Sequence, residues 1–207
     1  MKGLLLKDWY MTKKYCRSFL LVAFVFLAIS AFDNENMLFL TYPSIFVAML
    51  PMILFGYDEK FKWDVYCGTL PYSKEQMISE KYFFGLITTI PMILITGVLQ
   101  SIKLSAADAF SFAEVFELMA FLVLAAVLVN GVVFPLMVKF GSEKGRLAYY
   151  VMIGFATALA VLLPDVINAD LSGKVSIGFA PAALVAAVVI YALSWYLSIV
   201  FYKKREI

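Results

Sequence analysis

The sequence contains no histidine among its 207 residues and only two cysteines, Cys16 and Cys67. Without histidine, His-based general acid/base catalysis and most zinc sites are excluded, and no Cys or carboxylate cluster has the spacing of a metal site. A phosphate loop of the type Gly-x-x-x-x-Gly-Lys-Ser/Thr is also absent, because the nearest string, residues 141–146, has neither the spacing nor a preceding buried strand. We therefore expect no catalytic residue, cofactor or metal in this chain, which lacks the motif to hydrolyse ATP alone.

Charge is missing from six stretches of the chain, each without Asp, Glu, Lys or Arg. A helix needs roughly 20 residues to cross a hydrocarbon core about 30 Å thick. Four stretches reach that length; the first must borrow residues 15–17, and the fifth is borderline and would tilt or thin the bilayer. The stretches are residues 18–32, 36–57, 82–102, 118–138, 147–164 and 175–202. With 63% hydrophobic residues and a mean hydropathy of +0.89, the chain is predicted to be one all-α membrane domain, residues 1–207, with six spans; five spans is the alternative.

The distribution of basic residues predicts the orientation of these spans. Fifteen of the seventeen Lys and Arg residues fall on alternate connections, and only Lys103 and Lys174 fall on the others. Because positive connections stay in the cytoplasm, both termini are predicted to be cytoplasmic in a multi-pass protein of the cell membrane. Most Trp and Tyr residues, among them Trp9, Trp63 and Trp195, gather at the same interface, as in an aromatic belt.

Residues 1–17 have the pattern of a helix lying on the membrane, and no small-residue cleavage pattern of a signal peptide follows. At 100° per residue one side is mainly apolar and the other mainly basic. The residues predicted for this interfacial helix are Leu4, Leu5, Lys7, Trp9, Met11 and Tyr15. Asp8 is an exception, because it lies inside the apolar arc. An ordinary positive flank that sets topology is the alternative.

The six stretches also lack the ionisable side chain that ion- and proton-coupled transporters usually keep inside the bilayer. Their polar residues, such as Thr96, Asn130 and Ser194, are more often helix-packing contacts than substrate ligands. Asn130 is the most notable, since a buried amide in mid-span requires a partner. Any uphill transport must then take its energy from a partner protein.

The longest cytoplasmic connection, residues 58–81, is the place where such a partner would act. Residues 58–69 are predicted to form one short helix, with the pairs Asp58/Lys62 and Lys60/Asp64 at i,i+4. Gly68 ends it, Leu70-Pro71 forces an extended break, and Ser73 begins a second helix with Gln76 at the capping-box position. Such a stiff protrusion could transmit motion from a soluble partner into two spans.

These two regions resemble the small six-span permeases of type-2 ABC transporters of Gram-positive bacteria. The residues that carry the resemblance are residues 1–8, Asp58, Glu59, Trp63, residues 70–74 and residues 80–82. In that family two permease subunits pair with two separate ATPase subunits, and the connection after the second span forms the coupling helix. The resemblance thus implies ATPase partners, which carry the ATP and Mg, and a second permease of the same or a different kind.

The resemblance also implies which residues contact the ATPase. They are Asp58, Glu59, Lys60, Lys62, Trp63, Asp64, Tyr66, Pro71 and Ser73. Residues 4–15 would lie beside the ATPase, and amphipathic or antimicrobial peptides, or other hydrophobic compounds, would be the exported cargo.

Three classes of function remain open from the sequence. The first is the membrane half of an ATP-driven exporter, with lipid and protein but no nucleic acid as partners. The second is a passive pore, or a scaffold that recruits a cytosolic partner through residues 58–81; this connection could also be a solvated linker with its aromatic residues on the lipid headgroups. An intramembrane enzyme is the weakest reading, because the residues for its chemistry are missing.

Overall fold

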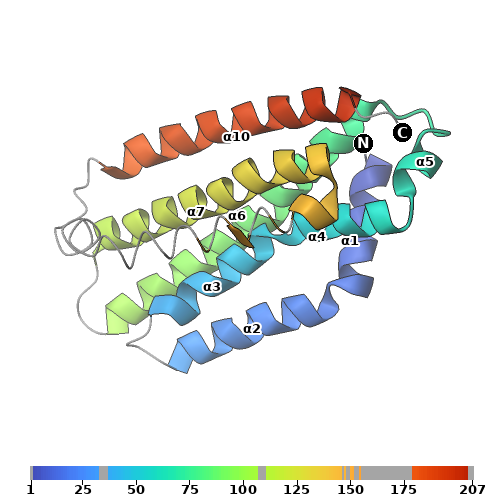
Figure 1. Ribbon diagram of the computed structural model, residues 1–207. Helices are drawn as coiled ribbons and strands as arrows, with labels where there is room; N and C mark the ends of the chain where they lie inside the picture. Colours follow the sequence, from blue (N-terminus) through green and yellow to red (C-terminus); the bar gives the residue numbers. More distant parts are fainter. Residues whose placement is uncertain are drawn as a thin grey trace.

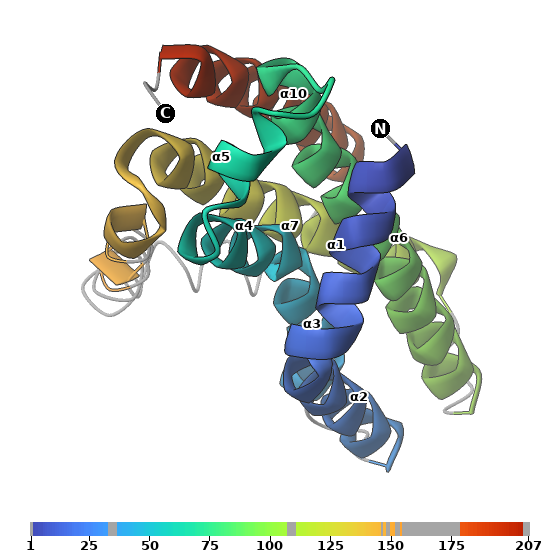
Figure 2. The ribbon, with the colours of Figure 1, turned by 90° about the vertical axis from the view of Figure 1, so that its right-hand side faces the viewer.

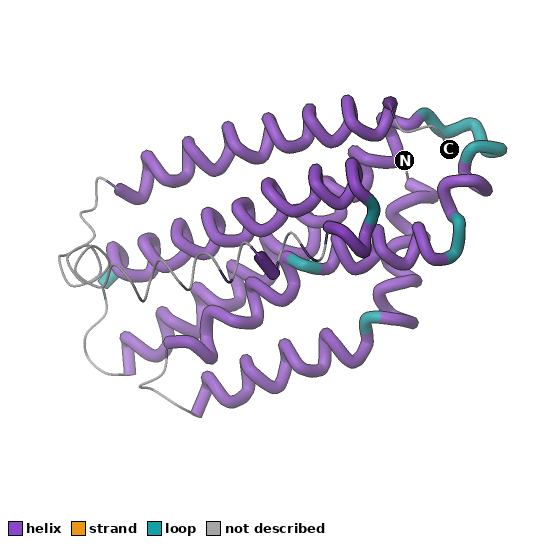
Figure 3. Tube along the Cα trace, viewed as in Figure 1, coloured by secondary structure: helices purple, strands orange, loops and turns teal. Residues whose placement is uncertain are grey.

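The computed structural model describes residues 2–32, 37–106, 111–145, 147, 150, 151, 154 and 179–204. Long helices in this part of the chain lie side by side and form a bundle, with α1 at one end of it (Figure 1). The described residues contain helices, turns and short loops and no strand (Figure 3). The predicted all-α fold is confirmed.

Two helices at the start of the chain meet at a sharp bend. α1, Lys2–Tyr15, joins α2, Arg17–Phe32, at an angle of 74°. α2 follows the bundle while α1 lies at its end, near the N-terminus (Figures 1 and 2). This orientation is the one that the predicted interfacial helix requires.

The second uncharged stretch forms two helices, α3, Met37–Ala48, and α4, Leu50–Lys60. Pro51 lies in the first turn of α4, where the backbone N–H that proline lacks has no partner within the helix. Proline inside a continuous helix would remove a hydrogen bond and clash with the preceding turn, so α3 does not continue through Pro51. The break at Met49 is therefore caused by proline chemistry. The two helices together still form a candidate span, Phe39–Lys60.

The connection after α4 differs from its prediction. The single helix expected over residues 58–69 is wrong, because α4 runs on to Lys60 and a turn at Phe61 and Lys62 separates it from α5, Trp63–Cys67. Lys62 has a positive φ of 53°, which breaks the helix. Asp58 consequently pairs with lysines of other helices rather than with Lys62.

α6, Lys74–Ala106, begins as predicted. Ser73 Oγ accepts a hydrogen bond from the Gln76 N–H, and Gln76 Oε1 accepts one from the Ser73 N–H, both at 3.2 Å, which confirms the capping box. The 33 residues of α6 extend about 50 Å, about 20 Å more than a hydrocarbon core. The charged residues 74–81 before the uncharged stretch therefore lie outside the spanning part.

α7, Phe112–Phe140, and α10, Phe179–Lys204, pack along each other and run in the same direction. The Lys139 amine lies 5.2 Å from the Phe201 ring centroid, so both helices end at the end of the bundle where α1 and α5 lie (Figure 1). The start of α10 lies at the opposite end.

The described helices include four candidate spans, or five if the bent pair α1–α2 counts as one. Beyond Phe39–Lys60, the candidates are Lys74–Ala106, Phe112–Phe140 and Leu184–Lys204. Most of the predicted fifth stretch, residues 147–164, lies outside the described residues, so the sixth span stays a prediction.

The core at the α1 end joins short elements to the spans. Leu4 of α1 and Cys67 of α5 are buried in one cluster with Phe55 of α4, Ile78 of α6 and Tyr202 of α10. Outward faces of α2 and α10 carry exposed apolar side chains, such as Phe24 and Val188, as expected of surfaces that meet lipid or another span. The packing thus fixes α1 and α5 to the spanning helices.

Candidate docking and coupling site

Five ionisable side chains from three helices, α1, α4 and α6, meet near the end of the bundle where α1 and α5 lie. Figure 2 shows the ribbon of these helices from that end. We call them the ionic cluster: Lys7 and Asp8 of α1, Asp58 of α4, and Glu80 and Lys81 of α6. Lys7 Nζ donates to both carboxylate oxygens of Asp58 at 2.7 Å. Lys81 Nζ donates to Asp8 Oδ2 at 2.6 Å and lies 2.6 Å from Asp58 Oδ2. Each lysine therefore links α1 to α4, and Lys81 adds α6.

The ionic cluster is almost completely removed from solvent. Asp8, Asp58, Glu80 and Lys81 are each less than 5% exposed, and only Lys7 lies partly at the surface. Burial acts to raise the pKa of Asp8, but the positive charges of Lys81 and Lys7 and a hydrogen bond with Glu80 lower it more, so this pKa lies below its ordinary value. Asp8 is thus held as a carboxylate, the form that both lysines require as a counter-ion.

Lys7 also connects the ionic cluster to α5. Its amine lies 4.6 Å from the centroid of the Trp63 ring, within the range of a cation–π interaction. Trp63 in turn packs on the buried core at this end, and Cys67 at the other end of α5 is fully buried in it. A five-residue helix cannot be stable alone, so its position is determined by these contacts.

The other side of α5 is open to solvent. Val65 and Tyr66 are 61% and 58% exposed, and Phe61 in the preceding turn is 54% exposed. These three apolar side chains are within five residues of one another in the chain. Figure 2 shows α5 at the end of the bundle. Exposed aromatic and apolar residues on a short, well-anchored helix are typical of a surface that binds another protein.

The structure divides the predicted ATPase-coupling residues into two groups. Those with exposed side chains are Lys60, Lys62, Tyr66, Pro71 and Ser73, and Trp63 is partly exposed. Asp58 is buried in the ionic cluster, so its side chain faces other helices and not solvent. Glu59 Oε2 accepts a hydrogen bond from the Ser142 N–H at 2.6 Å, which ties the end of α4 to the turn after α7. The side chain of Asp64 lies outside the described part.

The predicted residues of the interfacial helix also fall on two sides. Leu4 is buried, Leu5, Lys7 and Met11 are partly buried, and Trp9 and Tyr15 are exposed. Leu5 and Met11 pack against the cluster that joins α2 to α3 and α4. Gly3 lies so close to the segment after α5 that an added Cβ would be 3.0 Å from Tyr72 Oη. α1 therefore contacts the spans and the connection that carries α5.

Sequence reasoning did not assign a role to Asp8, Glu80 or Lys81. One signal was present for Asp8, because a carboxylate inside an otherwise apolar helix arc needs a buried partner. Adjacent charges directly before an uncharged stretch, Glu80 and Lys81, were the second signal. No pattern in the sequence predicted that Asp8 and Lys81, more than seventy residues apart, would pair.

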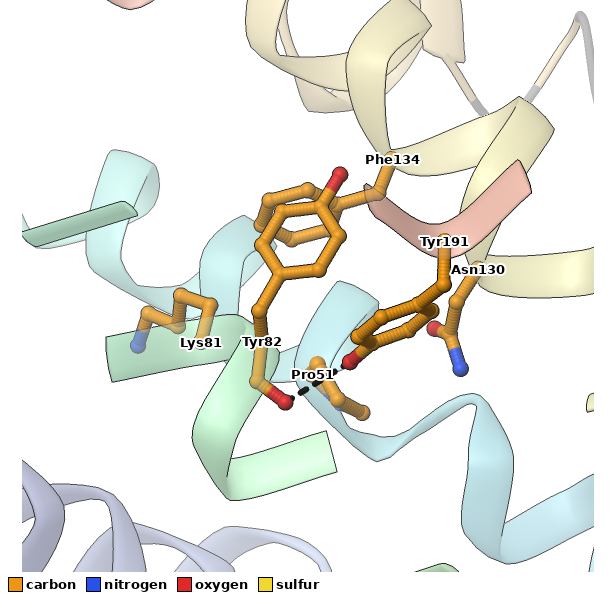
Figure 4. Close-up of a pocket in the computed structure, with 6 residues that line it drawn as sticks. All are labelled: Pro51, Lys81, Tyr82, Asn130, Phe134 and Tyr191. Carbon is orange, nitrogen blue, oxygen red and sulfur yellow. Dashed lines mark hydrogen bonds between the residues drawn. The ribbon is translucent and has the colours of Figure 1, made fainter. Parts of the chain in front are cut away.

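The interior of the bundle near this site contains a small cavity lined by residues of four helices, α4, α6, α7 and α10 (Figure 4). Its lining residues are Pro51, Lys81, Tyr82, Asn130, Phe134 and Tyr191. Tyr191 Oη donates to the Tyr82 carbonyl at 2.8 Å, and the Tyr82 hydroxyl bonds with Ser194 and Ser198 at 2.7 Å. Asn130 donates to the Ala126 carbonyl at 3.2 Å. The tyrosine bonds join α6 to α10, whereas the Asn130 bond lies within α7, and the cavity is too small for a peptide.

Comparison with known proteins places this arrangement in a family. No curated protein and no solved structure matches the chain. The model of one protein family, described as ABC-2 family transporter protein, matches residues 3–203. This match covers α1, the ionic cluster, α5 and most of the spans, so the resemblance carried by residues 1–8 and the α4–α6 connection is confirmed. The chain belongs to the ABC-2 family of transporter proteins and is a membrane permease of this kind.

Proposed function

We propose that this chain is the membrane half of an ATP-driven exporter and that α5 is the element on which a separate ATPase subunit docks. The observation that carries the proposal is the two-sided nature of α5. Tyr66 and Val65 are exposed, while Trp63 and Cys67 connect the same five residues to the spans. A push or pull on α5 from outside would therefore reach α1, α4 and α6 together.

The complex in this proposal contains two permeases and two ATPase subunits, which supply ATP and Mg. The membrane family supports the ATPase partners, since its members are the membrane components of ABC transporters. The second permease is proposed because the cavity within one subunit is small, so a path for cargo would lie between two subunits. Exposed apolar faces on α2 and α10 offer surfaces for that contact.

The proposed cargo is an amphipathic or antimicrobial peptide or another hydrophobic compound, moved out of the cell. Apolar spans without an ionisable residue suit such cargo better than an ion or a sugar. The proposed orientation has both termini in the cytoplasm, which places the docking surface on the side where ATP is available.

The experiment that tests this function is copurification from native membranes followed by an ATPase assay. The variant is Val65→Ser with Tyr66→Ala, which removes the exposed apolar side chains and leaves Trp63 and Cys67 in place. We expect at least about tenfold less ATPase bound per permease, as for the loss of a well-packed interface residue. Phe112→Ala, at a phenylalanine that is 74% exposed at the start of α7, away from α5, is the matched control and should leave ATPase binding unchanged.

Two outcomes would contradict the proposal. If the wild-type permease purifies without a nucleotide-hydrolysing subunit, a passive pore or a scaffold becomes the function to pursue. Equal retention of the ATPase by the α5 variant and the Phe112→Ala control would show that docking occurs elsewhere. Stimulation of the bound ATPase by amphipathic peptides, and not by sugars, is the expected result for the cargo.

A further inference from the structure

The charges of the ionic cluster do not balance when every member has its ordinary charge. Lys7 and Lys81 contribute two positive charges, while Asp8, Asp58 and Glu80 contribute three negative ones. Four of these five side chains are buried, and the fifth is only partly exposed. An uncompensated charge in such a place is strongly unfavourable, and a buried carboxyl group commonly avoids it by taking up a proton.

Two carboxyl oxygens in the cluster show where that proton belongs. Asp8 Oδ1 and Glu80 Oε1 are both buried and have no hydrogen-bond donor in the described part of the chain. Lys7 Nζ lies 2.9 Å from Asp8 Oδ1, but this ion pair lacks the geometry of a hydrogen bond. Carboxylates can only accept hydrogen bonds, so neither oxygen can satisfy the other unless one carboxyl group is protonated.

Asp8 and Glu80 lie close enough for each to change the pKa of the other through a side-chain hydrogen bond, so one proton between them would supply the donor that both oxygens lack. Glu80 is the stronger base of the pair, because its nearest carboxylate oxygen is 3.7 Å from Lys81 Nζ, whereas Asp8 accepts a hydrogen bond from the same amine at 2.6 Å. The lysines therefore stabilise the charge on Asp8 more than the charge on Glu80. The proton resides on Glu80, which donates to Asp8.

We propose that Glu80 and Asp8 form a proton-binding pair, in which one proton shared between the two carboxyl groups makes the ionic cluster neutral and fastens α1 to α6. The proton on Glu80 turns two facing acceptors into a donor and an acceptor. Loss of the proton gives two carboxylates in direct contact, which repel each other and separate the two helices.

The ionisable groups that surround Glu80 come from every helix packed on this site. They are Lys7 and Asp8 from α1, Asp58 from α4, Lys81 from α6 itself and Tyr202 from α10, which lines a second small cavity together with Glu80. Lys7 donates to Asp58 and Lys81 donates to Asp8, so the two cations of the ionic cluster are already balanced before a charged Glu80 is counted. The pair is therefore the group of the cluster that responds to a rise in pH.

The pair would also regulate docking, and this second step rests on the proposed function of α5. Lys7 contacts both Asp58 and Trp63, so a shift of α1 away from α6 moves the contacts that hold α5 in place. Deprotonation of the pair then weakens the coupling between the ATPase and the spans. The transporter would lose ATP-driven activity in an alkaline cytoplasm.

The test of the proton uses the purified permease alone in lipid nanodiscs, with Glu80→Gln as the variant. The Gln side chain is neutral and can donate to Asp8 as a protonated Glu does, so we expect the Tm at neutral pH to equal that of the wild type. The folded wild type binds a proton that the free carboxyl groups of the unfolded chain have released, so its stability falls as the pH rises. The Glu80→Gln variant should lose this alkaline fall in Tm.

A second variant and a spectroscopic measurement keep the result decisive if Glu80→Gln folds poorly. Asp8→Asn places the donor on the other member of the pair and should also fold and lose the alkaline fall. Infrared difference spectra between neutral and alkaline pH should contain the carbonyl band of a protonated carboxyl group in the wild type and not in either variant. Glu75→Gln, at an exposed pair with Lys203, is the control and should behave as the wild type.

The outcomes separate the two steps of the proposal. A large drop in the Tm of Glu80→Gln at neutral pH would show that Glu80 is a charged counter-ion and would overturn the proton pair, as would the absence of the infrared band. If the permease behaves as expected but no ATPase copurifies, the proton pair stands and the proposed docking function fails. If an ATPase copurifies and its coupled activity falls at alkaline pH equally in wild type and Glu80→Gln, the regulatory step is overturned.

Discussion

Lys81 is the residue on which the largest number of buried charges depends, since it contacts carboxyl groups from α1, α4 and α6. Replacing it by methionine keeps the length of the side chain but leaves Asp8 and Asp58 with only Lys7 as a cation. Removal of one partner from a buried ion pair typically costs roughly 3–5 kcal/mol. We expect Lys81→Met to lower the free energy of unfolding by about this amount, measured by denaturant titration in detergent micelles.

Lys203 provides the matched comparison, because it pairs with Glu75 in solvent with both side chains more than half exposed. Exposed pairs contribute about 0–1 kcal/mol, so Lys203→Met should be nearly neutral. Equal losses in the two variants would mean that the ionic cluster does not hold the α1 end together.

Residue-level features differ in how far the sequence determines them. Asp8 was noted only as an exception inside the apolar arc, although a carboxylate at such a position is a signal of a buried partner. The identity of the partner, Lys81, follows only from the way α1 folds back over the start of α6. Local periodicity contains no information about such a distant contact.

At the scale of the element, the turn between α4 and α5 decides where the docking surface lies. Lys62 adopts a φ of 53°, a conformation that costs a residue with a Cβ roughly 1 kcal/mol and glycine almost nothing. Lys62→Gly is expected to raise the free energy of unfolding by up to about 1 kcal/mol. Lys60→Gly, two residues earlier in the last turn of α4, should lower it by up to a similar amount.

Thermal unfolding of these two variants beside the wild type is the measurement, and opposite signs are the expected result. Destabilisation by both would indicate that residues 58–69 form the continuous helix that their i,i+4 charge pairs predicted. Those pairs were misleading because each contributes only a few tenths of a kcal/mol, less than the buried contacts that Asp58 gains with Lys7 and Lys81.

Other element boundaries followed from local chemistry alone. The capping box at Ser73 and Gln76 was predicted and is present. Both of its hydrogen bonds join residues only three positions apart, so local sequence is enough to predict it. The break at Met49 was not predicted, although Pro51 supplies its cause. The angle of 74° between α1 and α2 was not predicted. A bend of some size follows from the predicted interfacial helix, because such a helix must turn before the chain enters the membrane.

For the whole molecule, the number of crossings decides whether the two termini share a side of the membrane. α7 and α10 run in the same direction. The fourth and sixth spans of a chain with six crossings also run in the same direction, so this order agrees with the six spans predicted from the uncharged stretches. The first and last described helices, α1 and α10, accordingly meet at one end of the bundle (Figure 1).

Labelling of single cysteines tests this topology, starting from a variant in which the buried Cys16 and Cys67 are changed to alanine. Cysteines introduced at the exposed Lys2, Lys74 and Lys204 should all be protected from a membrane-impermeant thiol reagent in intact cells and react after the cells are opened. A cysteine at the exposed Ala106, at the other end of α6, should react in intact cells. Five crossings would instead place Lys2 and Lys204 on opposite sides, so one of these two positions would react before the cells are opened. That result would also put either α1 or the end of α10 on the side without ATP, although the ionic cluster and the Lys139–Phe201 contact hold both at the end of the bundle where α5 lies.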